Sequence, residues 1–208
     1  MLQFITNTES RTSVVDQIKG FISGGGRWVQ VRMKDATDEE IKKVIEEVKP
    51  LCIETDTFLL LDDRVELAKT LDVGGVHLGK EDMLPSKARM LLGPAAVIGV
   101  TANTIEDIKA VRSLDIDYIG MGPYAETQTK KKLAPILGLE GVRSLCVEME
   151  QLEINIAHVA VGGIGLEDVV PLMETGVNGL AVSGAIANSD DIKKATEDFL
   201  EAIKPFQK

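Results

Sequence analysis

The segment FLLLDDRVELAKTLDVGGVHL, residues 58–78, contains the repeating unit that decides the fold. Its two apolar runs, FLLL at 58–61 and GVHL at 75–78, have the length of buried strands. Between them, RVELAKTL carries apolar residues at three- and four-residue spacing, which predicts a helix. A short strand followed by a helix and a second short strand is a β/α unit.

The same alternation continues along the whole chain. The apolar runs are rich in Val, Ile, Leu and Gly on both faces, as expected for parallel strands that are covered on both sides. They are LQFI (2–5), WVQVRM (28–33), FLLL (58–61), GVHL (75–78), AVIGV (96–100), DYIGMG (117–122), HVAVGG (158–163) and GLAVSG (179–184). The stretches with helical period are TSVVDQIKGFI (12–22), DEEIKKVIEEVKPL (38–51), RVELAKTL (64–71), PSKARMLL (85–92), TIEDIKAVRSL (104–114), GLEGVRSLCVEM (138–149), LEDVVPLMETG (166–176) and DDIKKATEDFLEAI (190–203).

Eight β-then-α units in 208 residues predict an α/β fold with a single (β/α)8 TIM barrel, one domain over residues 1–208. An open doubly wound sheet is the alternative. We favour the barrel because the chain has no GxGxxG turn and the repeat continues through all eight units.

Composition limits the classes of partner and the location. The formal charge of -10 argues against a nucleic acid or an anionic membrane, both of which favour a basic surface. No apolar run reaches the roughly 18 residues that a membrane span needs, so we expect a soluble protein. Cys52 and Cys146 have no metal-ligand spacing and read as reduced packing residues. A reducing, cytoplasmic location is therefore expected.

In a barrel of this kind the active site lies at the carboxyl ends of the strands. Gln30, Arg32 and Lys34 alternate at the end of the second strand, which places them on one face. On the interior face two cations would be costly unless an anion meets them. The alternative is that Arg32 and Lys34 pair with Asp35 or a neighbouring carboxylate.

Carboxylates follow the third and fourth strands. Asp63 and Asp82 lie at adjacent strand ends, where they could share Mg²⁺ with water and phosphate oxygens. Asp62 precedes Asp63, and either of them could instead cap the next helix. A zinc site that joins His77 to His158 is disfavoured, because the two are far apart in the chain and have no Cys partner; packing is the favoured role for both.

The fifth and sixth strands are followed by hydroxyl groups and lysines. Thr101 could bind substrate or cap the next helix. The longest stretch without periodicity, about 123–137, is long enough in a compact fold to indicate a functional loop. It presents Thr127, Thr129 and Lys130, a set of donors suited to phosphate oxygens. A solvated surface run is the alternative for its lysines.

Small residues end the last two strands. Gly162 and Gly163 follow the seventh, and Val182, Ser183 and Gly184 follow the eighth. Such residues let backbone N–H groups approach a phosphate, and these two loops form the usual phosphate site of the fold.

The segments QVRMKDA, LLLDDRVELAKTLDVGGVHLGKEDM, IGVTANT, DYIGMGPYAETQTKKKLAPILG, VAVGGIGLEDV and NGLAVSGAI together resemble the thiamine-phosphate synthase (thiamine-phosphate pyrophosphorylase) family. The match runs in order from the second strand to the eighth. The resemblance implies a TIM barrel that joins 4-amino-2-methyl-5-hydroxymethylpyrimidine diphosphate to 4-methyl-5-(2-phosphoethyl)thiazole, with Mg²⁺ and release of pyrophosphate. It also implies a dissociative reaction, in which pyrophosphate leaves before the thiazole nitrogen attacks the pyrimidine cation.

Carried over residue by residue, the resemblance assigns three groups of site residues. Those for the pyrimidine diphosphate are Gln30, Arg32, Lys34, Asp62, Thr101 and Lys130, of which Arg32, Lys34, Thr101 and Lys130 also act in catalysis. The metal ligands are Asp63 and Asp82. Those for the thiazole phosphate are Thr127, Thr129, Gly162, Gly163, Val182 and Ser183.

Two positions depart from the commonest family pattern, because Asp62 stands where Asn is expected and Thr101 where Ser is expected. Two alternatives within the same pathway are a thiazole tautomerase and a non-catalytic binder of phosphorylated pathway intermediates. A barrel-fold phosphosugar isomerase is a remoter alternative. The expected partners are the two phosphorylated small molecules. A homo-oligomer is compatible with the sequence, which does not decide the oligomeric state.

Overall fold

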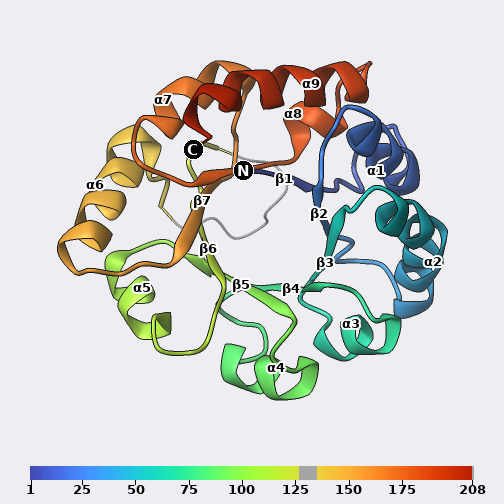
Figure 1. The fold of residues 1–208 in the computed structure, drawn as a ribbon, viewed down its shortest axis with the longest axis horizontal. Coiled ribbons are helices and arrows are strands. Elements are labelled where there is room, and N and C mark those ends of the chain that lie inside the picture. Colours follow the sequence, from blue (N-terminus) through green and yellow to red (C-terminus); the bar gives the residue numbers. More distant parts are fainter. Residues whose placement is uncertain (127–134, 208) are drawn as a thin grey trace.

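The structure of the protein is a computed structural model that describes residues 1–126 and 135–207. Its strands form a closed barrel in the order of the chain, and every neighbouring pair is parallel. They are β1 (Leu2–Ile5), β2 (Trp28–Val31), β3 (Phe58–Asp62), β4 (Gly75–Leu78), β5 (Val97–Ala102), β6 (Tyr118–Met121), β7 (Ala157–Val161) and β8 (Gly179–Val182). The predicted barrel is therefore confirmed (Figure 1).

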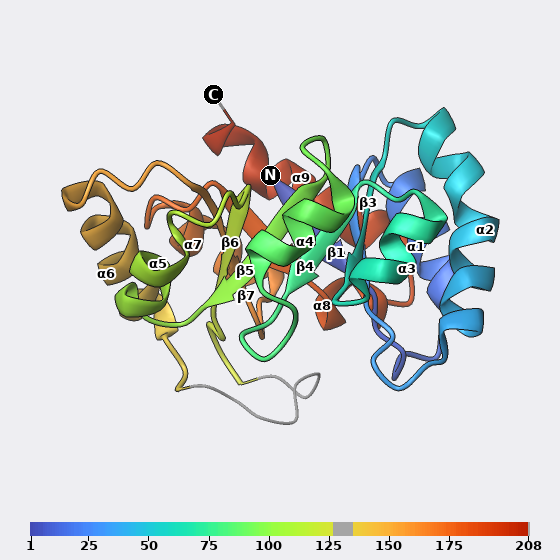
Figure 2. The same cartoon turned by 90° about the horizontal axis from the view of Figure 1, so that it is seen from below.

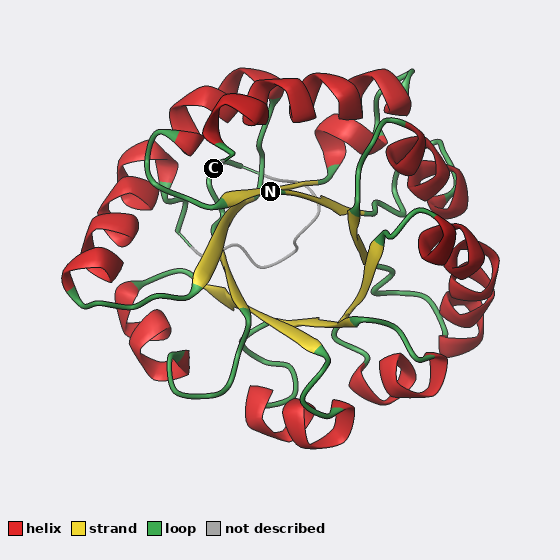
Figure 3. Ribbon diagram, viewed as in Figure 1, coloured by secondary structure: helices red, strands yellow, loops and turns green. Residues whose placement is uncertain are grey.

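The helices surround the ring of strands, as Figure 3 shows. They are α1 (Val14–Ser23), α2 (Asp38–Glu54), α3 (Val65–Leu71), α4 (Pro85–Leu92), α5 (Ile105–Val111), α6 (Gly138–Gln151), α7 (Val169–Met173), α8 (Gly184–Ala187) and α9 (Ile192–Ile203). Short 3-10 turns at Leu166–Asp168 and Lys204–Phe206 complete the described elements. In Figure 2, α8 lies toward the edge opposite the C-terminus, on the side to which the carboxyl ends of the strands point.

Several helices differ from their predicted extents, and α5, for example, ends at Val111 rather than at Leu114. The periodic stretch 166–176 forms a 3-10 turn and then the short α7, rather than one helix. Helix α2 continues three residues beyond the predicted end at Leu51 and contains Pro50. Helix α4 has the predicted bounds, since a proline at its first position and Gly93 at its C-cap mark both ends locally.

Alternation along the strands divides the core into two parts. Leu59 and Leu61 of β3 pack between strands and helices, whereas Leu60 packs inside the barrel. The inside cluster also contains Tyr118, Val159 and Ala181. Because side chains alternate along a strand, a polar residue two positions beyond an inside residue faces the mouth of the barrel.

Candidate active site

A cavity of about 760 Å³ opens at the carboxyl ends of the strands. Most of the predicted site residues that the structure describes line it, and these are Gln30, Arg32, Lys34, Asp62, Asp82, Thr101, Gly162, Gly163 and Ser183. Asp63 and Val182 are not among the lining residues. The predicted Thr127, Thr129 and Lys130 lie outside the described residues.

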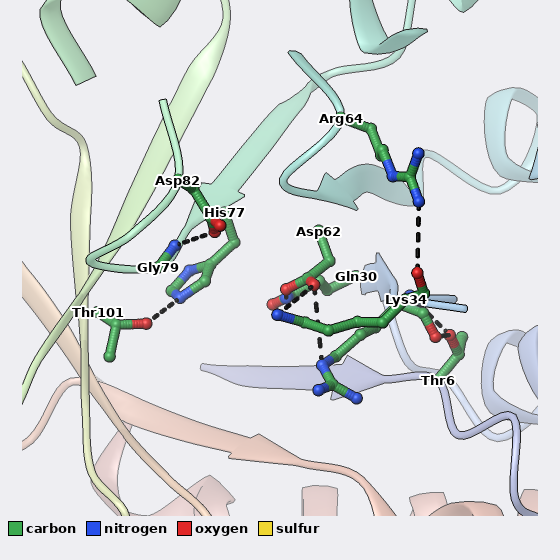
Figure 4. Close-up of polar contacts among 10 residues, drawn as sticks. Thr6, Gln30, Lys34, Asp62, Arg64, His77, Gly79, Asp82 and Thr101 are labelled. Carbon is green, nitrogen blue, oxygen red and sulfur yellow. Dashed lines mark hydrogen bonds and ion pairs between the residues drawn. The ribbon is translucent and has the colours of Figure 1, made fainter. Parts of the chain in front are cut away.

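One carboxylate faces the polar residues that follow β2. Gln30 Nε2 donates to Asp62 Oδ1 at 2.8 Å. Arg32 Nε and Lys34 Nζ each lie 3.8 Å from Asp62 Oδ2 (Figure 4). The two cations therefore have a neighbouring carboxylate as a partner, as the alternative reading of the sequence allowed, and that carboxylate is Asp62.

Asp62 is the last residue of β3 and its side chain is only 11% exposed. Burial raises the pKa of its carboxyl, and the negative charge of Asp82 acts in the same direction. The positive charges of Lys34 and Arg32 lower it, but burial is the larger effect. Arg32 and Lys34 therefore compensate the burial of the Asp62 carboxylate only in part. This carboxylate lies beside the same two cations that a bound diphosphate would need.

Asp63 and Asp82 interact through their charges. Burial raises the pKa of Asp63, and the negative charge of Asp82 raises it further. Asp63 has a positive φ of 63°, and its backbone N–H donates to His77 O at 2.8 Å. Asp82 Oδ2 accepts from Gly79 N at 2.6 Å. The residues that the structure describes contain no group of three or more His, Cys, Asp or Glu side chains placed to hold a metal.

The helix-cap alternative for Asp62 and Asp63 is wrong. The residue at the N-cap of α3 is Arg64, and no side chain makes a cap hydrogen bond there. Neither carboxylate is therefore used by the helix that follows.

The cap alternative is also wrong for Thr101. It lies within β5, and Thr104 caps α5 by accepting from Asp107 N at 3.2 Å. Thr101 Oγ1 instead lies 3.0 Å from His77 Nε2, where it lines the cavity.

His77 and His158 do not meet. His77 lines the cavity and its Nδ1 lies 2.8 Å from Tyr118 Oη. His158 bonds through Nδ1 to Ile156 O at 2.9 Å, near the start of β7. The favoured packing role for His77 is incomplete, because both of its ring nitrogens have polar partners.

The glycine pair after β7 is required by a close approach of backbone. Gly162 and Gly163 have φ of 100° and 67°. A Cβ at Gly162 would lie 3.0 Å from Pro123, and one at Gly163 would lie 2.6 Å from Glu126 O. Ala125 N donates to Gly162 O at 3.0 Å, so the start of the loop after β6 packs directly on this turn. The glycines therefore hold two loops together at the cavity.

The described ends of the loop after β6 are joined to each other. Leu137 N donates to Pro123 O at 2.9 Å, and Gly138 N donates to Tyr124 O at 3.0 Å. Tyr124 Oη also donates to Asp168 Oδ1 at 2.8 Å. These bonds fix where the predicted phosphate-binding segment leaves and re-enters the barrel.

The two predicted residues after β8 are placed differently. Val182 packs in the core between strands and helices, so only its backbone faces the strand end. Ser183 lines the cavity, and its buried Oγ has no hydrogen-bond partner within the described residues. A ligand oxygen is the kind of partner that such a hydroxyl lacks.

Sequence reasoning missed part of the cavity wall. The additional polar residues include Gln3, Asn7, Lys80, Asn103, Glu126 and Glu167. Gln3 could have been found, because it is a polar residue inside the apolar run LQFI. Lys80 bonds to Asp107 Oδ2 at 2.5 Å, so it is committed to a partner outside this wall.

Comparisons with known proteins agree over nearly the whole chain. The family model described as thiamine monophosphate synthase matches residues 2–186. A Bacteroides fragilis protein named thiamine-phosphate synthase is 48% identical over 199 residues, which cover 96% of this chain and 98% of that protein. A Pyrococcus abyssi protein of the same name is 33% identical over 190 residues, 91% of this chain and 88% of its own.

Solved structures show the same relationship. The thiamine phosphate pyrophosphorylase of Pyrococcus furiosus superposes with a TM-score of 0.87 and 29% identity, covering 100% of this chain and 96% of that chain. In the part of the chain that the structure describes, none of the helices combines the length and the apolar character needed to cross a bilayer.

Proposed function

The chain belongs to the thiamine monophosphate synthase family and is a thiamine-phosphate synthase, a transferase, and from this premise we propose how its cavity performs the reaction. The substrates are the pyrimidine diphosphate and the thiazole phosphate, and the products are thiamine phosphate and pyrophosphate. The observation that carries the proposal is the pair of cations, Arg32 and Lys34, on the cavity wall with one buried carboxylate between them.

Arg32 and Lys34 bind the diphosphate. Their distances of 3.8 Å to Asp62 are longer than the 2.7–2.9 Å typical of charge-assisted hydrogen bonds. Their N–H donors are therefore still available to phosphate oxygens. Lys130, outside the described residues, adds a third cation in this proposal.

The donor set at β3 and β4 fits Mg²⁺. This ion keeps several waters and binds through one or two carboxylates together with substrate phosphates. Asp63 and Asp82 supply two carboxylates, and burial together with the negative charge of Asp82 raises the pKa of Asp63. Asp82 Oδ2 is oriented by Gly79 N, which leaves its other oxygen for the ion. When bound there, Mg²⁺ supplies charge neutralisation of the diphosphate.

The protein contributes electrostatics and positioning rather than a nucleophile. As the bond between the pyrimidine methylene carbon and the diphosphate oxygen breaks, its electron pair leaves with the diphosphate. Arg32 and Lys34 stabilise the charge that develops there. The thiazole nitrogen then donates its electron pair to the methylene carbon, and the new C–N bond forms. Gln30 of β2 and Thr101 of β5 both line the cavity, and in this proposal they hold the pyrimidine.

The thiazole phosphate binds at the ends of β7 and β8. Gly162 and Gly163 expose backbone there without side chains, and Ser183 offers a buried hydroxyl without a partner in the described chain. Thr127 and Thr129 complete this group in the proposal.

The cation pair also separates the proposal from its alternatives. A thiazole tautomerase has no use for Arg32 and Lys34 in the cavity wall. Asp62, which stands where the family pattern has Asn, is the sequence feature that favours a non-catalytic binder, but it accepts a hydrogen bond from Gln30 and lies near both cations.

The test is a direct assay with both phosphorylated precursors and Mg²⁺, following thiamine phosphate and pyrophosphate. We expect equimolar products and their loss in EDTA, restored by excess Mg²⁺. Turnover unaffected by EDTA would contradict the metal proposal alone. Absence of product with a thiazole phosphate still bound would contradict the placement of the diphosphate and favour the tautomerase.

A further inference from the structure

A chain of hydrogen bonds crosses the interior of the barrel and ends at Thr101. Gln3 Nε2 of β1 donates to Tyr118 Oη of β6 at 2.9 Å. Tyr118 Oη lies 2.8 Å from His77 Nδ1 of β4, and His77 Nε2 lies 3.0 Å from Thr101 Oγ1 of β5. Four strands thus contribute one residue each, and of these Gln3, His77 and Thr101 line the cavity.

The barrel makes room for this chain with glycines in its strands. A Cβ at Gly99 would lie 2.1 Å from the ring of Tyr118, and a Cβ at Gly120 would lie 3.1 Å from His77 Cε1. Tyr118 also packs edge-on against Trp28, with ring centroids 4.9 Å apart. The rings of Tyr118 and His77 are therefore held by packing as well as by hydrogen bonds.

The first bond fixes the direction of the others. Because Tyr118 Oη accepts from Gln3, its own hydrogen is available to His77 Nδ1. Burial raises the pKa of Tyr118 far above its usual value, so the phenol keeps that hydrogen. A His77 ring that accepts at Nδ1 carries its hydrogen at Nε2 in the neutral form. Nε2 then donates to Thr101 Oγ1.

We propose that Gln3, Tyr118 and His77 are positioning residues that hold the Thr101 hydroxyl as a donor directed at the bound pyrimidine substrate. Since Thr101 Oγ1 accepts from His77, its hydrogen is left for an acceptor atom of the ligand. His77 thereby determines that the Thr101 hydroxyl donates toward the ligand. His77 itself transfers no proton. This inference rests on the proposed function, in which Thr101 contacts the pyrimidine diphosphate.

The tautomer of His77 tests the donor-to-acceptor direction of these hydrogen bonds without any assay of activity. Protein labelled with ¹⁵N in its two histidines gives long-range ¹H–¹⁵N spectra that separate protonated from unprotonated ring nitrogens. A His158→Gln variant assigns the signals. We expect His77 to be protonated at Nε2 alone, and to become a mixture of tautomers in Tyr118→Phe. Protonation at Nδ1 in the wild type would overturn the proposal.

A double-mutant cycle tests the positioning role. Thr101→Val removes the hydroxyl, and Tyr118→Phe removes the bond that orients His77. Tyr118→Phe alone should lower kcat about tenfold, the effect of losing one well-aligned hydrogen bond, with KM within about twofold. In the Thr101→Val background the same change should have less than about twofold further effect, because there is no hydroxyl left to orient. Equal effects in both backgrounds, or an unchanged kcat in Tyr118→Phe, would overturn it.

The control for loss of a buried hydroxyl is Thr196→Val. Thr196 is fully buried in α9, where its Oγ1 donates to Ile192 O at 2.8 Å, and its loss should leave kcat unchanged. If Tyr118→Phe fails to fold, Gln3→Met removes the first donor and should give the same kinetic result. If the wild type forms no thiamine phosphate, the proposed function fails, and the tautomer of His77 still decides whether the chain has the proposed direction.

Discussion

At the scale of single residues, Asp62 is the position where this chain departs most from its family resemblance, and its surroundings predict what the departure does. The pKa of Asp62 is raised, chiefly by burial. The protonated form is therefore more favoured in the folded than in the unfolded state, so the contribution of Asp62 to stability is most favourable at low pH. That contribution is lost as the pH rises through the raised pKa.

Asp62→Asn should consequently stabilise the fold at neutral pH. Its amide oxygen can still accept from Gln30, and no buried charge remains. We expect the midpoint of thermal unfolding at pH 7 to rise by a few degrees, with the difference vanishing at acid pH. KM for the pyrimidine diphosphate should fall about threefold to tenfold, because a like charge beside the ligand is removed. Asp190→Asn, at a 93% exposed side chain, makes the same change in net charge and should alter neither quantity.

Arg32→Ala tests the placement of the diphosphate. Its side chain is 21% exposed on the cavity wall, and its loss removes a donor to the leaving group. We expect kcat/KM to fall about 100- to 1,000-fold, the range for loss of one electrostatic donor. Arg112→Ala, on the exposed end of α5, serves as the matched control. A loss under about threefold in Arg32→Ala would mean that the diphosphate binds elsewhere.

At the scale of elements, the turn after β7 and the start of the loop after β6 act as one unit. Gly163→Ala introduces a Cβ that would lie 2.6 Å from Glu126 O, at a φ of 67°. Gly138→Ala is its control, because Gly138 has a φ of 60° and nothing within 4 Å of the added Cβ. The two changes share the cost of a positive φ, of about 1 kcal/mol, and differ in the clash.

Gly163→Ala should therefore lower the free energy of unfolding by about 1–3 kcal/mol more than Gly138→Ala does, as measured in urea. It should also raise KM for the thiazole phosphate, because the two loops must separate to admit the methyl group. Equal stability losses in both variants would show that the backbone of the turn shifts freely, and that the close approach has no consequence for the site.

The strands and the cavity face could be predicted because their signals are local. Period 2 is enough to put Gln30, Arg32 and Lys34 on one face, and a proline with a glycine marks both ends of α4. The contact between His77 and Tyr118 could not be predicted, because the two are 41 positions apart and meet only when the barrel closes. The opposite facing of Val182 and Ser183, by contrast, follows from the alternation of side chains at the end of β8.

At the scale of the whole molecule, the proposed function requires an acidic protein to bind an anionic substrate through a local group of cations. The formal charge of -10 disfavours general binding of polyphosphates, and Lys80 is paired with Asp107. A rise in the thermal stability of the protein on adding a small anion therefore indicates binding at Arg32, Lys34 and the proposed metal site, rather than binding to the surface. Pyrophosphate, the proposed leaving group, is the simplest such probe.

Pyrophosphate with Mg²⁺ should raise the midpoint of thermal unfolding by about 5–10 °C at 100 times its Kd, because binding to the native state alone contributes about 2.7 kcal/mol at that ratio. The rise should shrink in EDTA and in Asp82→Asn, since the carboxylates and the diphosphate share the ion. It should nearly vanish when Arg32 and Lys34 are both replaced by alanine. Sodium chloride at equal ionic strength controls for screening. A rise that survives the loss of both cations would place the anion outside the cavity, and the proposed division of the site between diphosphate and thiazole phosphate would be wrong.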